Sequence, residues 1–196
     1  MAPLTIHSTI TLNTGTKIPQ LGFGVWDSPS HLTTSSCLAA LKSGYRHIDT
    51  AQAYTNEIEV GTAIVQSGIP RKDIFVTSKI VTPADDGSVE STYAKVLESV
   101  EKCGGKGGYL DLMLIHNQAP GREKVKVMWQ AMEKLHAEGK IVSIGVSNFG
   151  TGTIEGMREY AKVWPPSVNQ LEVCLSYPIV CHSAEEWPTM LMMDCV

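Results

Sequence analysis

Four polar side chains in this sequence combine types and positions that could do chemistry together. Asp49 ends a short apolar-flanked stretch, and Tyr54 follows five residues later in a predicted loop. Lys79 and His116 each end a later apolar run that also predicts a strand. The carboxyl ends of parallel strands meet on one face of a (β/α) fold, so we expect these four side chains to line one pocket.

The chemistry that suits these types is proton donation to a carbonyl oxygen while a hydride reaches the carbonyl carbon. A phenol with a pKa near 10 is a poor acid at neutral pH. We expect the ammonium of Lys79 to lower the pKa of Tyr54, and Asp49 to hold Lys79 in place. His116 would donate a hydrogen bond that orients the carbonyl. No side chain can supply a hydride, so this chemistry requires a nicotinamide cofactor.

Each of the four residues also has a simpler structural explanation when taken alone. Asp49 could cap a turn, Tyr54 could pack a loop, and Lys79 could be a solvated strand end. His116 could be a hydrogen-bonded histidine at the rim of a sheet. All four lie at or just beyond the ends of successive strands, which favours one common site over four unrelated structural roles.

The elements that must position these residues alternate along the chain. An alternating apolar and polar stretch over residues 4–18 predicts an N-terminal hairpin. Strands are predicted at 21–26, 46–50, 74–79, 110–116, 142–148 and 167–173. Helices are predicted at 30–43, 57–67, 88–102, 125–139 and 151–162. Strands that are apolar on both faces and alternate with helices indicate a parallel α/β sheet.

Two parallel architectures fit this alternation, the (β/α)8 TIM-type barrel and the doubly wound sheet. The first strand is not followed by Gly-x-Gly-x-x-Gly, which argues against a dinucleotide-binding doubly wound sheet. We therefore predict the barrel. Only about six βα units can be counted in the 196 residues, whereas a complete barrel has eight and about 250 residues.

Composition excludes several other classes. The formal net charge is −4, with no lysine and arginine stripe, so no nucleic-acid partner is expected. No run of 18 apolar residues predicts a membrane span, and no signal peptide is visible at the N-terminus. The five cysteines are scattered without Cys-x-x-Cys, which indicates reduced thiols in a cytoplasmic protein and no metal site.

Several segments of the chain resemble the aldo-keto reductase family. Gly44–Glu57 is similar to its first signature, Met132–Phe149 to its second, and Leu21–Trp26 to its first strand. The matches run in the correct order from about residue 18 to residue 172. The following residues match the family's catalytic tetrad one by one: Asp49, Tyr54, Lys79 and His116. The resemblance implies reduction of an aldehyde or ketone to an alcohol with NADPH.

The resemblance also implies binding residues. Ser147, Asn148 and Gln170 match residues that hydrogen-bond the nicotinamide carboxamide, and Asp49 would border the cofactor as well. Ser147 and Asn148 could instead cap the helix predicted from residue 151. Trp26 matches an aromatic position that lines the substrate pocket, where His116 would also contact substrate.

The sequence departs from the family pattern at three places. Asn117-Gln118-Ala119 follows His116, and Val81 stands where the family often has a loop aromatic, so the resemblance does not choose a substrate. After Val173 the family continues with further strand–helix units, whereas this chain has a divergent run. We therefore predict an incomplete reductase barrel over 1–173 and a divergent C-terminal tail over 174–196, whose methionines pack or are disordered.

This departure leaves three functions open. The chain could be a working reductase that acts on a small-molecule carbonyl. Members of the family also act in secondary metabolism, so the reaction could be a tailoring step there. It could be a truncated reductase with weak or no activity, or a non-catalytic binding protein. Six strands cannot close an eight-stranded barrel, so the unpaired strand edges could also pair with a second copy of the chain.

Overall fold

The computed structural model describes residues 4–105, 107–173 and 190–194, and it contains two sheets. The small sheet is an antiparallel hairpin of β1 (Thr9–Thr11) and β2 (Lys17–Pro19). The large sheet is parallel and follows sequence order: β3 (Phe23–Gly24), β4 (His47–Asp49), β5 (Phe75–Ile80), β6 (Leu110–Ile115), β7 (Ile141–Ser147), β8 (Asn169–Val173) and β9 (Met190–Asp194).

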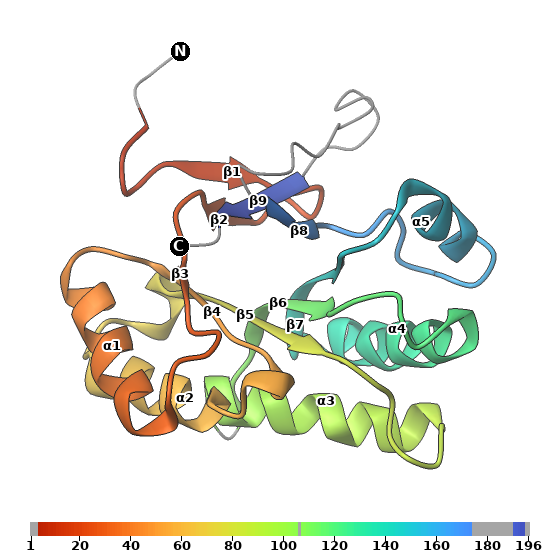
Figure 1. The fold of residues 1–196 in the computed structure, drawn as a ribbon, viewed down its shortest axis with the longest axis horizontal. Helices are drawn as coiled ribbons and strands as arrows, with labels where there is room; N and C mark the ends of the chain where they lie inside the picture. The colour runs from red at the N-terminus through yellow and green to blue at the C-terminus, as the bar shows by residue number, and fades with distance from the viewer. Residues whose placement is uncertain (1–3, 106, 174–189, 195–196) are drawn as a thin grey trace.

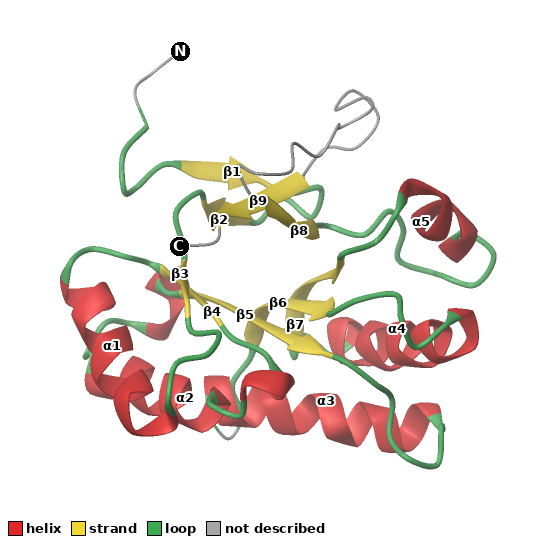
Figure 2. Cartoon of the chain, in the orientation of Figure 1, coloured by secondary structure: helices red, strands yellow, loops and turns green. Residues whose placement is uncertain are grey.

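Helices connect most of these parallel strands. They are α1 (Ser30–Lys42), α2 (Glu57–Gln66), α3 (Val89–Gly104), α4 (Arg122–Ala137) and α5 (Thr151–Met157), with 3₁₀ turns η1 (Gln52–Tyr54) and η2 (Arg71–Asp73). Figures 1 and 2 show α1 to α4 along one side of the large sheet and the hairpin on the other. This order of strands and helices is the barrel arrangement that the sequence predicted.

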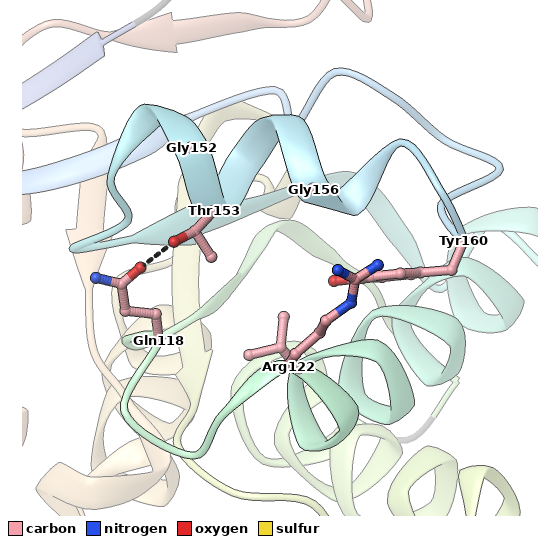
Figure 3. Close-up of a pocket in the computed structure, with 7 residues that line it drawn as sticks. Gln118, Arg122, Gly152, Thr153, Gly156 and Tyr160 are labelled. Carbon is pink, nitrogen blue, oxygen red and sulfur yellow. Dashed lines mark hydrogen bonds between the residues drawn. The ribbon is translucent and has the colours of Figure 1, made fainter.

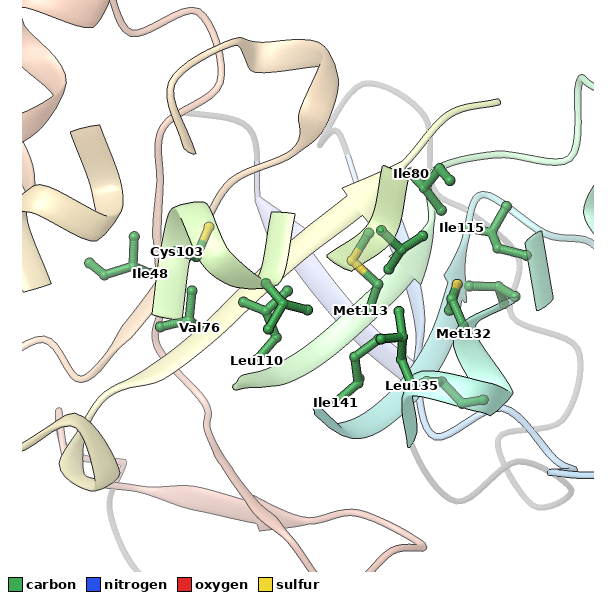
Figure 4. Close-up of a cluster of buried hydrophobic side chains, with 14 of the residues drawn as sticks. Ile48, Val76, Ile80, Cys103, Leu110, Met113, Ile115, Met132, Leu135 and Ile141 are labelled. Atoms are coloured by element: carbon green, nitrogen blue, oxygen red, sulfur yellow. The ribbon is translucent and has the colours of Figure 1, made fainter. Parts of the chain in front are cut away.

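The central strands are buried on both faces, which explains their nearly continuous apolar sequences. Every residue of β5 and of β6 is buried. The helix-facing side chains form the main core, part of which Figure 4 shows, with members including Ile48, Val76, Met113, Met132 and Leu135. A second cluster joins the hairpin to the opposite face of the sheet: Leu12, Ile18, Phe75, Leu112, Leu114 and Val168.

The large sheet curls strongly. Strands β4 and β8 are separated by three other strands, which would put them about 19 Å apart in a flat sheet with ordinary strand spacing. The Gln170 Nε2 atom on β8 nevertheless donates a hydrogen bond of 3.1 Å to Asp49 Oδ2 on β4. The sheet is therefore a partial barrel, whose concave face gathers side chains from strands that are not neighbours.

The hairpin and the six predicted strands are confirmed, but the last predicted helix is shorter than expected. The sequence predicted a helix over 151–162, whereas α5 ends at Met157. Glu133 of α4 accounts for part of the difference, because its Oε1 atom accepts hydrogen bonds from the backbone N–H groups of Lys162 and Val163 at 2.6 and 2.8 Å. These N–H groups thus bind a side chain and do not continue the helix.

The structure adds one strand that the sequence did not predict. Residues 190–194 form β9, which pairs in parallel with β8, and Asn169 lies opposite Met190. The remainder of the predicted tail over 174–196 lies outside the described residues, and the domain boundary after residue 173 stays a prediction. No helix in the described part of the chain is both long enough and apolar enough to cross a membrane.

Candidate active site

A buried ion pair lies at the carboxyl end of neighbouring strands β4 and β5. Lys79 Nζ lies 2.5 Å from Asp49 Oδ1 and donates a second hydrogen bond to the Thr50 carbonyl at 3.1 Å. Lys79 and Asp49 are only 2% and 3% exposed. The strand register places Asp49 opposite Thr77, so Lys79 projects from the same face of the sheet one step further along. Strand pairing therefore fixes the position of this ammonium.

Tyr54 and His116 complete the predicted group of four. Tyr54 ends η1, and its Oη atom lies 3.5 Å from Lys79 Nζ. The Lys79 ammonium also lies 5.1 Å from the centre of the Tyr54 ring. The His116 ring, just beyond β6, meets the Tyr54 ring edge-on with centroids 5.6 Å apart and an interplanar angle of 78°. The structure thus brings all four residues together at one end of the sheet.

The pKa of Tyr54 differs from the sequence-based expectation. Burial raises the pKa of Tyr54 above its ordinary value of 10, although Lys79 acts in the opposite direction. Asp49 also raises the pKa, because its negative charge lies beside the ammonium and opposes its effect. Lys79 thus lowers the pKa of Tyr54 as expected, but burial outweighs this effect, and the phenol holds its proton at neutral pH.

His116 is set up as a neutral imidazole. Burial lowers the pKa of His116 below its ordinary value of 6.5, and the nearby Lys79 charge lowers it further. Its Nδ1 atom is buried and has no hydrogen-bond partner in the described part of the protein. A neutral imidazole carries one N–H donor and one acceptor, so His116 can donate a hydrogen bond beside the Tyr54 phenol without adding charge.

Three amide and hydroxyl side chains extend the site across the concave face. Ser147 Oγ donates to the Gln170 carbonyl at 2.9 Å, and Asn148 Nδ2 donates to Ser147 Oγ at 3.0 Å and to the His116 carbonyl at 3.2 Å. The Gln170 side chain reaches Asp49, as described above. A carboxamide needs both donors and acceptors from its binding site, and this set of side chains supplies both. The residues therefore fit a nicotinamide carboxamide.

Trp26 lies apart from this hydrogen-bonded group. It follows β3 on the loop toward α1, and it is 74% exposed. An exposed indole at the rim has apolar surface available to a ligand, and its polar N–H remains in water. Its predicted role in substrate binding stays a prediction.

Left-handed backbone conformations accompany the predicted site residues. The non-glycine residues with positive φ in the described chain are Asp27, Thr55 and Asn148, with φ of 57°, 57° and 58°. Each directly follows or is itself a predicted site residue. Such conformations cost energy in residues with a Cβ atom, and they persist where the surrounding structure fixes them. The backbone at this end of the sheet is thus held in place by its neighbours.

The sequence did not reveal the residues that fix the loop carrying Tyr54. Asn56 directly precedes α2, but its side chain makes no helix cap. Its Oδ1 atom accepts from Thr50 Oγ1 at 2.8 Å, and its Nδ2 atom donates to the carbonyls of Val25 and Ser28 at 2.9 and 3.3 Å. The only sequence signal was an asparagine between the phenol and a helix, and that signal is too common to be informative.

Buried His47 makes a testable contribution to pH dependence. It lies on β4, its Nε2 atom is 2.9 Å from Thr77 Oγ1, and burial lowers its pKa to about 4. In the unfolded chain His47 is protonated below a pH of about 6.5. In the folded chain it is protonated only below a pH of about 4. Stability should therefore fall between these values as the pH decreases, by up to about 3 kcal/mol from this group.

Urea unfolding at a series of pH values would measure this effect. Replacing His47 with glutamine should flatten the slope of the unfolding free energy over that window, although His116 adds a smaller slope of the same sign. His31→Gln, at an exposed position, is the matched substitution with which the slope of His47→Gln is compared. An unchanged slope in His47→Gln would show that the imidazole is not held neutral.

A cavity of about 290 Å³ lies between α4 and α5, beside the candidate site but separate from it. Figure 3 shows its lining, in which Thr153 donates a hydrogen bond to Gln118 across one end and Arg122 lies near Tyr160. None of the predicted catalytic or cofactor-binding residues lines it. No group of three histidine, cysteine or acidic residues within the described ranges is placed to hold a metal ion.

Comparisons with known proteins show the family of the chain. The model of the aldo/keto reductase family matches residues 20–186. An aldo-keto reductase of Mycolicibacterium smegmatis is 44% identical over 164 residues, which cover 84% of this chain and 58% of that protein. The glyoxal reductase of Bacillus subtilis is 42% identical over 171 residues, covering 87% of this chain and 59% of that protein. The chain thus spans about three-fifths of the length of these relatives.

Solved structures give the same result for the fold. An aldo/keto reductase from Brucella melitensis superposes with a TM-score of 0.77 at 44% identity, covering 85% of this chain and 63% of that one. An aldo-keto reductase from Bombyx mori, solved in complex with NADP, has a TM-score of 0.74 at 32% identity, with coverage of 85% and 58%. From the sequence match, the fold and the four clustered side chains, the chain belongs to the aldo/keto reductase family.

Proposed function

We propose that the chain reduces an aldehyde or ketone to an alcohol with NADPH. The observation that carries this proposal is the contact of Tyr54 with both Lys79 and His116 at the carboxyl ends of adjacent strands. Tyr54 Oη lies 3.5 Å from the Lys79 ammonium, and its ring contacts the His116 ring. A proton donor, a cation and a neutral hydrogen-bond donor then surround the place where a carbonyl oxygen would lie.

In this mechanism Tyr54 is the general acid. Its proton passes from Oη to the carbonyl oxygen as the carbonyl carbon is reduced, which leaves an alcohol and a tyrosinate that later regains a proton from solvent. The pKa of Tyr54 is raised, so the phenol carries its proton before reaction. The tyrosinate formed on donation is stabilised by the ammonium of Lys79, and this interaction grows as negative charge develops on Oη.

The other residues orient and hold the reacting groups. His116, as a neutral imidazole, would donate a hydrogen bond to the carbonyl oxygen and stabilise its developing charge. Asp49 fixes the Lys79 ammonium at 2.5 Å, and Gln170 fixes Asp49 from the other side. Ser147, Asn148 and Gln170 would hold the carboxamide of the cofactor. When bound, the nicotinamide supplies the hydride.

Two findings support NADPH and a cytoplasmic setting for this proposal. A structural neighbour from Bombyx mori was solved with NADP. Cys37 and Cys103 are free and buried, as expected where thiols stay reduced. The carbonyl substrate is a small molecule, and the setting in secondary metabolism and the pairing of strand edges between copies stay predictions.

Titration of NADPH fluorescence, followed by turnover with an aromatic aldehyde, tests the proposal on the purified chain. We expect quenching on cofactor binding and consumption of NADPH that depends on the aldehyde. Absence of quenching at millimolar NADPH would contradict the proposal and favour an inactive reductase remnant. Quenching without turnover across a panel of aldehydes and ketones would favour a non-catalytic binding protein.

A further inference from the structure

A buried carboxylate on the helix side of the sheet connects the backbone segments that carry Lys79 and Tyr54. Glu57, the first residue of α2, is only 4% exposed. Its Oε1 atom accepts a hydrogen bond of 2.5 Å from Ser78 Oγ, and its Oε2 atom accepts one of 3.3 Å from Ser99 Oγ. Lys102 Nζ, from α3, approaches Oε2 at 4.0 Å.

The first arm of this network leads to Lys79. Ser78 directly precedes Lys79 in β5, and successive side chains of a strand point to opposite faces. The Lys79 side chain therefore enters the concave site, while the fully buried Ser78 side chain points toward α2 and α3. A hydrogen bond to Ser78 thus fixes the backbone from which the ammonium projects.

The second arm leads to Tyr54. Ser99 Oγ accepts a hydrogen bond of 2.9 Å from Gln52 Nε2, which also donates to the Lys95 carbonyl at 3.2 Å. Gln52 begins the single 3₁₀ turn that Tyr54 ends. The arms together make a closed ring of contacts, in which Glu57 lies opposite the contact between Tyr54 Oη and Lys79 Nζ.

We propose that Glu57 is a positioning residue, which sets the distance between the Tyr54 hydroxyl and the Lys79 ammonium through Ser78 on one arm and through Ser99 and Gln52 on the other. The inference rests on the proposed reductase function for its kinetic consequences, but its geometric content is independent of turnover. The simpler alternative is that Glu57 only stabilises the fold as a buried acidic group in the first turn of a helix.

The direction in which the pKa of Tyr54 changes when Glu57 is replaced distinguishes a positioning role of Glu57 from a purely stabilising one. The charged groups that act on the Tyr54 phenol are Lys79 and Asp49, and the neutral His116 ring lies against it. Removing the negative charge of Glu57 could act directly on the phenol only by lowering its pKa. Movement of Tyr54 away from Lys79 would raise the pKa as long as the phenol stays buried. A rise on substitution of Glu57 therefore reports displacement.

The test is titration of Tyr54 in cofactor-free protein by NMR of ring-labelled tyrosine, with its signal assigned by its absence from Tyr54→Phe. We expect Glu57→Ala to raise the pKa of Tyr54. We expect it to lower kcat by about 10²-fold with little change in KM, as for a misplacement of about 1 Å. Glu57→Gln removes the charge but keeps hydrogen bonds to both serine hydroxyls, so it should not raise the pKa.

Asp111 provides a matched control for loss of a buried carboxylate. Its Oδ2 atom accepts from the backbone N–H of Val76 at 2.9 Å and from Arg71 at 2.8 Å, so it supports the same strand β5 away from the site. Asp111→Ala should lower the unfolding free energy but leave the pKa of Tyr54 unchanged. A pKa of Tyr54 that is unchanged or lower in folded Glu57→Ala would overturn the inference.

Smaller substitutions in each arm keep the test decisive if Glu57→Ala fails to fold. Ser78→Ala and Gln52→Met should each raise the pKa of Tyr54, and the double variant should raise it by less than the two single effects combined, because both act through one carboxylate. No rise in either variant would contradict the proposal. A rise without any turnover in the wild-type chain would support Glu57 as a positioning residue and contradict the reductase function.

Discussion

Replacing Tyr54 with phenylalanine should lower kcat for carbonyl reduction by about 10²- to 10⁴-fold, the usual contribution of a positioned general acid. The substitution removes one oxygen and keeps the ring that contacts His116, so NADPH binding should be retained. Steady-state turnover with saturating aldehyde, combined with NADPH fluorescence titration, would measure both quantities on one preparation.

Tyr93 offers the matched control for this experiment. It lies on α3, and its hydroxyl donates a hydrogen bond of 2.6 Å to Glu138 Oε2, on the helix side of the sheet. Tyr93→Phe removes the same atom from a tyrosine outside the site and should leave kcat unchanged. Equal turnover of Tyr54→Phe and the wild-type chain would refute the assignment of Tyr54 as the acid.

Replacing Lys79 with methionine should have the largest effect on stability. The substitution leaves the Asp49 carboxylate, which is 3% exposed, without its ammonium partner. Breaking a buried pair on one side costs about 3–5 kcal/mol, because the remaining charge stays desolvated. Urea unfolding should show this loss, and turnover should fall as well because the tyrosinate formed on proton donation loses its cation.

The double variant Asp49→Asn with Lys79→Met tests the cause of that loss. It removes both charges, so it should recover a large part of the unfolding free energy that Lys79→Met loses, while turnover stays low. The exposed pair of Lys134 with Glu90, 2.7 Å apart, is the control, and Lys134→Met should change stability little. A double variant no more stable than Lys79→Met would show that lost packing, and not an unpaired charge, causes the effect.

The sequence predicted that Asp49, Tyr54, Lys79 and His116 lie together, because each position follows from a nearby strand. Asp49, Lys79 and His116 each lie at or just beyond the end of an apolar run. The end of such a run predicts the carboxyl end of a strand. Parallel pairing in sequence order is then sufficient to place these strand ends side by side. The hairpin and the six strands β3 to β8 were predictable from the same kind of local pattern.

The features that the sequence did not predict depend on contacts between distant segments. The end of α5 at Met157 involves the Glu133 side chain of α4. The loop that carries Tyr54 is held by hydrogen bonds from Gln52 to α3 and from Asn56 to the loop after β3. The raised pKa of Tyr54 depends on a balance between burial and two opposite charges, and residue types alone do not give its sign. Strand β9 has little periodicity to distinguish it from a tail.

The hydrogen bond between Asp49 and Gln170 has a consequence for how the protein could fail. It joins two strands that have three other strands between them in the sheet, so its length depends on how strongly the whole sheet is bent. A slight unbending would separate these side chains before any ladder hydrogen bond broke. The chain could then show an unaltered far-ultraviolet spectrum and a cooperative melt, yet hold its ammonium and its amide groups too far apart to act on one ligand.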